Sequence, residues 1–301
     1  MSLNNPSKPP SDPPPGAAPG AATPVLLVRK LVAEIAAGEV RLPSFPDFAT
    51  RVQKVLEDSR AAPAQIAQVI AADAALAARI LRLANSAFMN PSGRQIKDLK
   101  RAVAQLGHQL VRCSAVSFAL RQMELDGGNA ELRSQLQELW RKGMLVASIA
   151  YVLARETRGA SPDEALVTGL MHNIGRLYIT VSFPLGDARD AGDDAWADVV
   201  NEWHPRIAHA ILKHWGFPAQ IVAAVGAQNS WDRETQGGEA LTDILIAATA
   251  LVPCVFSREQ LDDTVTAVPP FRRLGLDAAR CQRLMADSAQ QIRSLQAALS
   301  G

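Results

Sequence analysis

Apolar residues recur three and four positions apart along almost the whole chain from Val25 onward. Residues at this spacing lie on one face of an α-helix, so the pattern predicts one amphipathic helix after another. Pro63 suits the first turn of one of these helices, and Asp73 is placed to cap the next. The sequence contains no pair of segments that predicts a β-hairpin and no repeat of fixed period. An all-α fold is therefore the prediction.

The apolar stripes also indicate where the helices begin and end. They predict helices over residues 25–35, 48–56, 63–70, 74–85, 96–107, 132–152, 161–175, 196–203, 204–215, 218–227, 240–256 and 277–299. A loop is expected at 126–129 and a looser segment at 183–194. Residues 42–46 predict an extended turn, because each of their two prolines restricts the residue before it.

Composition divides the chain into three parts. Residues 1–24 hold eight of the 19 prolines and no aromatic residue, so we expect a disordered tail, with a polyproline ligand or spacer as the alternative. Residues 25–125 carry an excess of basic side chains and predict a small N-terminal helical bundle. Residues 126–301 carry an excess of acidic side chains and predict longer helices.

The overall composition indicates a globular protein of one or two domains. The chain has 301 residues, a formal charge of +1 and 48% hydrophobic residues, which excludes disulfide-dense miniproteins, fibrous proteins and polyelectrolytes. Its three cysteines form no CxxC pair, so neither a disulfide framework nor a thiolate zinc site is predicted. No segment has the pattern of a signal peptide or a membrane span. We therefore expect a soluble protein of the cytoplasm.

The five histidines are the first candidates for chemistry. His204, His209 and His214 lie on one predicted helical stretch, but at about 100° per residue they cannot all face one metal ion. The sequence contains no HExxH pair. We therefore expect these three side chains to hold no metal, and we expect no cofactor.

His172 and Asn173 belong to a more informative motif. The run from Gly169 to Leu177, GLMHNIGRL, resembles the core motif of the HD phosphohydrolases, in which a histidine and the aspartate after it bind metal. The resemblance places Lys142 where these enzymes have their first histidine, and Gln228 where a later histidine often stands. A lysine ammonium offers no lone pair, and an amide oxygen is a weaker ligand than a carboxylate. The resemblance therefore implies a degenerate site with no metal and no catalytic residue.

Further motifs along the chain resemble the HDOD domain, an HD-related output domain of bacterial signalling proteins. They are, in order, LPSFP at 42–46, DAAL at 73–76 with LRLANSA at 81–87, the helix over 96–107, and the stretch from His204 to WGFP at 215–218. Ala74 departs from the family, which usually has proline there. The resemblance covers about residues 25–295. It implies a small N-terminal helical bundle packed on a degenerate HD-type helical domain, with no established catalysis.

The resemblance also implies where a ligand or a partner segment would bind. The expected site is a groove between the two helical parts, at the degenerate HD positions. Its predicted residues are Trp140, Lys142, His172, Asn173, Glu202 and His204. We expect His172 to satisfy buried backbone or carboxylate groups near Trp140 and Glu202, so that its loss lowers stability rather than a rate.

Two features of the N-terminal part could also bind a ligand. Asn85 and Ser86 suit either a signal-contacting site or the end of a helix, and the helix end is the favoured interpretation. The second feature is a basic cluster, which suits nucleic acid or a cyclic dinucleotide. It contains no aromatic residue, so an ordinary solvated face is favoured. The cluster comprises Arg94, Lys97, Lys100, Arg101 and Arg112, with Asp98 among them.

Three functions follow as hypotheses. The favoured one is a non-catalytic HDOD signalling or adaptor protein of bacteria, which binds a protein partner or a ligand such as a nucleotide. The first alternative is a metal-dependent HD-type phosphohydrolase acting on nucleotides or cyclic dinucleotides, which requires bound metal despite the substitutions. The second alternative is a regulator that binds nucleic acid through its basic N-terminal half, with an affinity that falls steeply with salt.

Overall fold

The structure of the protein, a computed structural model, describes residues 51–126, 130–182, 193–232, 240–254 and 259–300, except positions 53, 57, 59 and 88, together with Ala33. The predicted tail at 1–24, the predicted helix at 25–35 apart from Ala33, and the predicted extended turn at 42–46 lie outside the described residues, as does most of the predicted looser segment at 183–194. The predicted loop at 126–129 also lies outside them, except Asp126, which ends α5.

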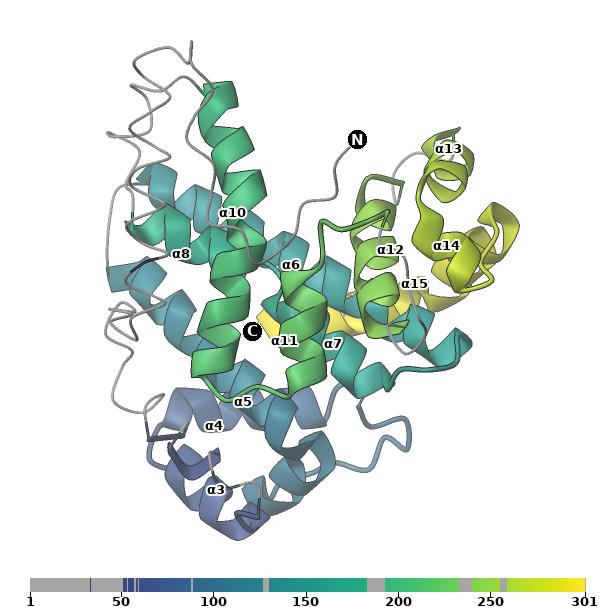
Figure 1. Cartoon of the computed structure of the whole chain (residues 1–301). Helices are drawn as coiled ribbons and strands as arrows, with labels where there is room; N and C mark the ends of the chain where they lie inside the picture. The colour runs from purple at the N-terminus through teal and green to yellow at the C-terminus, as the bar shows by residue number, and fades with distance from the viewer. Residues whose placement is uncertain are drawn as a thin grey trace.

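All regular secondary structure in these described ranges is helical, which confirms the all-α prediction (Figure 1). The helices are α3 (Pro63–Ile70), α4 (Ala74–Ala84), α5 (Leu99–Asp126), α6 (Ala130–Glu156), α7 (Pro162–Met171), α8 (Ile174–Ser182), α10 (Asp193–His214), α11 (Ala219–Gly226), α12 (Ala240–Cys254), α13 (Glu259–Ala267), α14 (Pro269–Arg273) and α15 (Ala278–Ser300). None of them is long and apolar enough to cross a lipid bilayer.

The first helices begin where the sequence predicts. Pro63 lies in the first turn of α3, where its missing N–H removes no helical hydrogen bond. The Asp73 carboxylate accepts a 2.8 Å hydrogen bond from the N–H of Leu76 and so caps α4. Gly107 has a φ of 73° and divides α5 into two helical stretches. The predicted helix indeed ends there, but a second stretch follows at once and continues to Asp126.

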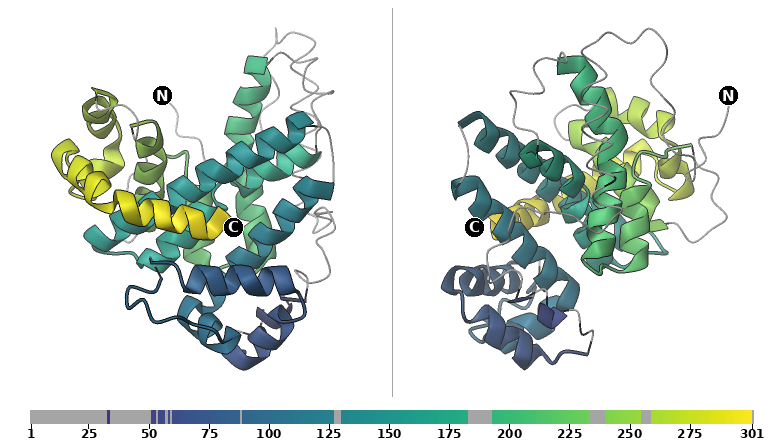
Figure 2. Two further views of the ribbon diagram at one scale, coloured as in Figure 1. Left: turned by 180° about the vertical axis from the view of Figure 1, so that it is seen from behind. Right: turned by 60° about the vertical axis from the view of Figure 1, so that its left-hand side comes forward.

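Helix α6 is a long helix against which α5, α7, α8, α12 and α15 pack. It contacts α7, α12 and α15, and α15 also reaches α4 in the N-terminal part. Seen from behind, α15 crosses the middle of the molecule, while α3 and α4 lie together at its lower end (Figure 2). Helix α10 packs against α8 and α11. The segments before and after the His172 motif are thereby held between α6 on one side and α10 on the other.

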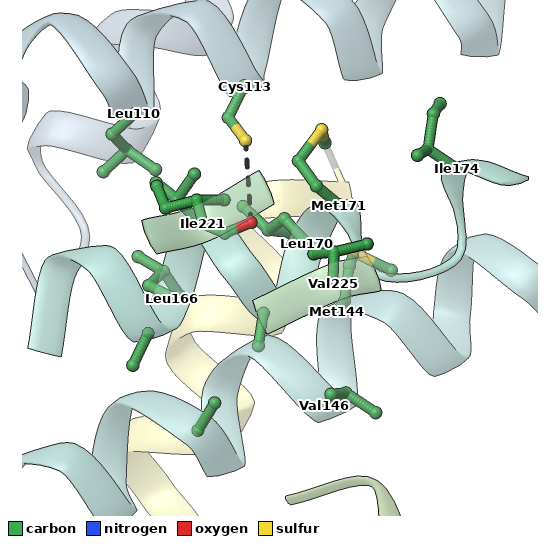
Figure 3. Close-up of a cluster of buried hydrophobic side chains, with 14 of the residues drawn as sticks. Leu110, Cys113, Met144, Val146, Leu166, Leu170, Met171, Ile174, Ile221 and Val225 are labelled. Atoms are coloured by element: carbon green, nitrogen blue, oxygen red, sulfur yellow. Dashed lines mark hydrogen bonds between the residues drawn. The ribbon is translucent and has the colours of Figure 1, made fainter. Parts of the chain in front are cut away.

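A continuous hydrophobic core joins these helices. Figure 3 shows one part of it, where α5, α6, α7, α8 and α11 meet. Burial of each Leu, Ile, Val or Met side chain in this cluster contributes about 1.5–3 kcal/mol to the free energy of folding. The Cys113 thiol lies in this cluster, 4.0 Å from the carbonyl oxygen of Val167, and burial raises its pKa far above the usual range. The labelled side chains are Leu110, Cys113, Met144, Val146, Leu166, Leu170, Met171, Ile174, Ile221 and Val225.

Arg112 connects the N-terminal helices to the C-terminal part of the chain. Its guanidinium donates hydrogen bonds to the carbonyls of Trp215 (2.9 Å) and Gly216 (2.7 Å), and a third to the carbonyl of Leu56. It also lies 5.5 Å from the centre of the Phe217 ring. Only 4% of Arg112 is exposed, so its assignment to the basic cluster is wrong. Its charge is engaged by three backbone carbonyls instead of facing solvent.

Other helical features differ from the prediction, and one of them is α8, of which the predicted ranges include only residues 174 and 175. The two helices predicted over 196–203 and 204–215 form one helix, because α10 continues through Pro205 to His214. Helices α13 and α14 were not predicted, since α13 is short and mostly polar and α14 has only five residues. Ser161 precedes α7 as expected, yet its side chain makes no capping hydrogen bond.

Candidate functional site

A cavity of about 730 Å³ lies where α6, α8, α10, α12 and α13 converge around the His172 motif. It includes five of the positions singled out from the sequence, but all of its lining residues belong to the part over 126–301, so it does not lie between the two helical parts as predicted. Its lining is Leu139, Lys142 and Val146 of α6; His172, Asn173 and Arg176 of the α7–α8 segment; His204 of α10; Gln228, Asn229 and Trp231 after α11; Ile246, Thr249, Ala250, Val252 and Pro253 of α12; and Asp263, Thr264, Ala267 and Val268.

Two glycines bring the walls of this cavity into backbone contact. A Cβ on Gly169 would overlap the Cα of Ala147 in α6 and would lie 2.7 Å from that residue's nitrogen. A Cβ on Gly175 would overlap the carbonyl oxygen of His204 in α10 and would lie 3.0 Å from the nitrogen of Ala208. The HD-like motif therefore needs glycine at both ends, because the turn that carries His172 is held between two helices.

His172 is buried at the turn between α7 and α8. Its Nδ1 lies 2.6 Å from the carbonyl oxygen of Gly169, and since a carbonyl only accepts, Nδ1 carries the proton. Burial, opposed by this hydrogen bond and assisted by the nearby Arg176 charge, lowers the pKa of His172 from 6.5 to about 4. The ring is therefore neutral at pH 7, with a lone pair on Nε2. His172 thus bonds to a buried backbone group, the carbonyl of Gly169.

Asn173 and Gln228 use their amide groups as donors to the backbone. The Asn173 Nδ2 lies 3.4 Å from the carbonyl oxygen of Leu139 in α6. The Gln228 Nε2 donates to the carbonyls of His172 (3.1 Å) and Val225 (2.8 Å). Both side chains are buried. These two residues thus tie the His172 turn to its neighbours.

His204 is buried in the opposite wall, with 2% of its surface exposed. Neither of its ring nitrogens has a hydrogen-bond partner among the described residues. Burial, together with the charge of Arg176 and the neighbouring His172, lowers the pKa of His204 to about 2. A neutral imidazole always carries one N–H and one lone pair, so this wall holds an unsatisfied donor and an unsatisfied acceptor.

Pro205 explains one of the hydrogen bonds next to this wall. Without an N–H at position 205, the carbonyl of Asn201 loses its usual helical donor. The Asn229 Nδ2 supplies a replacement at 2.7 Å. The side-chain oxygen of Asn201 accepts a 2.5 Å hydrogen bond from the guanidinium of Arg176. This network fixes both Arg176 and Asn229 at the edge of the cavity.

The remaining predicted positions divide between the cavity and other surfaces. Lys142 lies at the cavity with about half of its side chain exposed, and its Nζ is 3.5 Å from the Glu138 carboxylate. Trp140 is buried but does not line the cavity, and its indole nitrogen has no partner in the described structure. Glu202 is exposed and also lies outside the lining. Their inclusion in the groove is corrected, because residues two apart on a helix face opposite directions.

The cavity was tested for the divalent metals that the HD motif implies. Among the residues that the structure describes, no group of three His, Cys, Asp or Glu side chains is placed to hold a metal ion. Lys142 offers no lone pair, and the amide nitrogens of Asn173 and Gln228 face carbonyl oxygens. The neutral imidazoles of His172 and His204 are the remaining nitrogen atoms near the motif that could bind a metal. This set of side chains does not fit a two-metal hydrolase centre.

The HDOD domain profile matches residues 42–231 of the 301. The protein belongs to the HDOD domain family. The match includes every cavity residue from α6 to Trp231, while α12, α13 and α15 lie beyond it. This HDOD protein is also 24% identical over 213 residues to an uncharacterized protein of Treponema pallidum (strain Nichols). The alignment covers 65% of this chain and 39% of that relative, so the chain spans about two fifths of the relative's length.

Solved structures show the same fold. A protein of Shewanella amazonensis SB2B, provisionally named a metal-dependent phosphohydrolase, has a TM-score of 0.70 at 23% identity, covering 92% of this chain and 99% of its own. An HDOD domain protein of unknown function from Geobacter sulfurreducens has a TM-score of 0.60 at 23% identity, covering 91% and 99%. These likenesses confirm the predicted architecture, an N-terminal helical bundle packed on an HD-type helical domain.

A second cavity, of about 570 Å³, lies in the described N-terminal part of this HDOD protein, and Asn85 and Lys97 are among its lining residues. The Asn85 amide donates to the carbonyls of Leu81 (2.8 Å) and Ile96 (2.7 Å) and accepts from the N–H of Ile96 (2.7 Å). Ser86 likewise bonds to the end of α4. The helix-end interpretation of Asn85 and Ser86 is therefore confirmed. The four exposed members of the basic cluster are Arg94, Lys97, Lys100 and Arg101.

Two parts of the site were missed from the sequence. Arg176 follows the HNIG motif directly, and its position on the first turn of α8 could have indicated that it faces the same way as Asn173. The wall formed by α12 and α13 was also missed, because the α12 residues are mostly ordinary apolar side chains of a helix and α13 was not predicted. Trp231 at the edge of the cavity is the one large apolar side chain of the described set that is exposed, at 47%.

Proposed function

We propose that this HDOD protein is a non-catalytic signalling module of bacteria that acts in the cytoplasm by binding a ligand or a partner protein. The observation that carries the proposal is which residues occupy the metal-binding positions of the HD motif and what they bond to. Lys142 stands in place of a histidine, and the amides of Asn173 and Gln228 donate to backbone carbonyls. A family related to signalling is the context in which such a module would act.

The chemistry of the cavity supports binding over hydrolysis. Metal-assisted hydrolysis of a phosphate ester needs ligands that hold the ion and a water that the ion makes nucleophilic. Here the two imidazoles and two amides are all neutral, no carboxylate completes a metal-binding group with them among the described residues, and a cation, Lys142, lies beside them. A divalent cation would meet repulsion from Lys142 and Arg176 before it reached His172.

The size and composition of the cavity suit a small ligand. Small-molecule sites commonly have volumes of about 300–1,000 Å³ and a few polar groups in an apolar wall. The 730 Å³ cavity combines apolar residues of α12 with a small number of polar side chains around His172. This arrangement can recognise a ligand without changing it.

The hydrolase alternative takes its support from the provisional name of the Shewanella amazonensis relative. The experiment that separates the two measures the metal content of protein purified without chelators, and then hydrolysis of nucleotides and cyclic dinucleotides with added Mn²⁺. We expect less than stoichiometric metal and no turnover. Stoichiometric metal, with turnover that is lost in His172→Asn, would overturn the proposal and establish an enzyme.

A further inference from the structure

Arg176 is a cation at the cavity without an acidic partner. Its guanidinium is half-buried, and its hydrogen bond at 2.5 Å goes to the neutral side-chain oxygen of Asn201. No described carboxylate forms an ion pair with it. Burial of a guanidinium without a counter-charge is costly, and burial here lowers the pKa of Arg176. A guanidinium presents five N–H donors, so most of its hydrogen-bonding capacity remains available.

His204 is a second, independent indication of a ligand. It lines the same cavity, and only 2% of its surface is exposed. Neither ring nitrogen has a hydrogen-bond partner among the described residues. Each unsatisfied buried polar atom lowers stability, so such atoms in a native protein call for an explanation. An incoming acceptor beside the neutral His204 and the charged Arg176 would satisfy the N–H of the imidazole and would accept from the guanidinium.

The net charge of the lining has the sign that such an acceptor needs. Lys142 and Arg176 are the two basic residues of the lining, and exposed Asp263 is its one acidic residue in the described structure. Glu138 partly neutralises Lys142 at 3.5 Å, but that carboxylate is already engaged by Arg141 at 2.8 Å. The cavity therefore presents a positive potential to a ligand.

The opposite side of the cavity is mostly apolar. Helices α12 and α13 supply Ile246, Ala250, Val252, Pro253 and Ala267, Val268 follows them, and the polar residues of this side are Thr249, Asp263 and Thr264. Trp231 stands at the same cavity with 47% of its surface exposed. An aromatic side chain left this exposed beside an apolar wall offers a flat surface for stacking.

We propose that the cavity binds an amphipathic organic anion, with one carboxylate, sulfonate or phosphate group held by Arg176 and an apolar body held between Trp231 and the α12–α13 wall. This inference rests on the proposed function and specifies the ligand class of the same site. Arg176 supplies charge-assisted hydrogen bonds to the anionic group, and Lys142 adds attraction from the rim. The apolar body gains affinity from removal of its surface from water.

A pair of fluorescent probes tests the two halves of the proposal separately. Anilinonaphthalene sulfonate carries an anionic group on an aromatic body, and phenylnaphthylamine has nearly the same body without the charge. Binding of each to the full chain is measured by fluorescence titration and calorimetry. We expect the sulfonate to bind at one site per chain, at least about tenfold more tightly than the neutral amine.

Three variants locate the binding. Arg176→Gln should weaken binding of the sulfonate by about tenfold to a hundredfold and leave binding of the amine within about twofold. Ala250→Phe should fill the α12 side of the cavity and weaken both probes. Arg101→Gln is the matched control, because Arg101 is exposed in the basic cluster and does not line the cavity. If Arg176→Gln fails to fold, Lys142→Gln at the half-exposed rim should still reduce the preference for the sulfonate.

The outcomes separate this inference from the proposed function. Equal affinity for the two probes, no binding of either, or a sulfonate preference that survives Arg176→Gln would each overturn the inference. The proposed function is tested by metal content and turnover, which none of these titrations measures. A protein without turnover that fails the probe test remains a non-catalytic module with a different ligand.

Discussion

Gly175 lies against the carbonyl group of His204, so closely that a Cβ at position 175 would overlap the carbonyl oxygen and lie 2.9 Å from the carbonyl carbon. The obstacle is backbone, which cannot swing aside as a flexible side chain can. Gly175→Ala should therefore force α8 away from α10 and lower the free energy of unfolding by about 1–3 kcal/mol or more.

Chemical denaturation of Gly175→Ala measures this effect, and Gly143→Ala serves as its matched control. A Cβ on Gly143 would meet only the carbonyl oxygen of Leu170 at 3.8 Å, which is ordinary contact. Inside α6 alanine is favoured over glycine by about 0.5–1 kcal/mol, so this variant should be at least as stable as the wild type. Similar stability of the two variants would contradict the close α8–α10 crossing.

The replacement of a helical donor by Asn229 predicts a measurable coupling with Pro205. Asn229→Ala should lower the free energy of unfolding by about 1 kcal/mol, because it leaves the Asn201 carbonyl without its donor. In a Pro205→Ala background the N–H of residue 205 can bond to that carbonyl, so the same substitution should cost less. A double-mutant cycle measures the difference, expected to be at least about 0.5 kcal/mol. Additive effects would show that the two residues act independently.

The buried guanidinium of Arg112 predicts a large loss of stability on its removal. Arg112→Met keeps much of the side chain's volume but leaves the carbonyls of Leu56, Trp215 and Gly216 without their donor. Hydrogen bonds from a charged group contribute about 1.5–3 kcal/mol each, so we expect a loss of more than about 2 kcal/mol in urea denaturation. Arg101→Met on the exposed surface should change stability by less than about 0.5 kcal/mol.

The lowered pKa of His172 predicts a dependence of stability on pH. The native pKa of about 4 lies below the ordinary 6.5, so between these values the unfolded chain binds more protons than the native protein. Stability should therefore be complete above about pH 6.5 and fall as the pH drops toward 4. The difference corresponds to about 3 kcal/mol at about 1.36 kcal/mol per pH unit. His204 acts in the same direction, and the Arg176 charge lowers both pKa values.

Equilibrium unfolding at a series of pH values checks this prediction. His172→Asn retains an amide that can donate to the carbonyl of Gly169, but it cannot take up a proton in this range. Between pH 6.5 and 4, the free energy of unfolding should therefore decrease less in this variant than in the wild type. His214→Asn, on the exposed end of α10, is the matched control. An unchanged slope in His172→Asn would mean that His172 does not contribute to it.

Local sequence signals predicted the elements whose stabilising contacts are local. Pro63 and Asp73 mark the starts of α3 and α4 because a first-turn proline and a capping carboxylate act within three residues. Asn85 was assigned to a helix end for the same reason, although its partner Ile96 lies eleven residues away. The HDOD motifs added the global arrangement of the helices, which periodicity alone does not contain.

The unpredicted features depend on partners far away in the sequence. Separate helices were predicted over 196–203 and 204–215, yet α10 continues through Pro205, and Asn229, 28 residues beyond Asn201, supplies the missing hydrogen bond. Arg112 was assigned to a basic surface, but its carbonyl partners lie 56, 103 and 104 residues away. The isolated charge of Arg176 likewise depends on which acidic side chains the fold leaves at a distance. Spacing along one helix carries no information on any of these.

The position of Arg112 has a consequence for how the chain folds. Its carbonyl partners stand 56 residues before it and more than 100 residues after it, and closing loops of that length is slow because of the chain entropy it removes. We expect these hydrogen bonds to form after the transition state for folding. Arg112→Met should then accelerate unfolding while leaving the folding rate nearly unchanged. In the native protein, the hydrogen bonds of this guanidinium therefore slow unfolding.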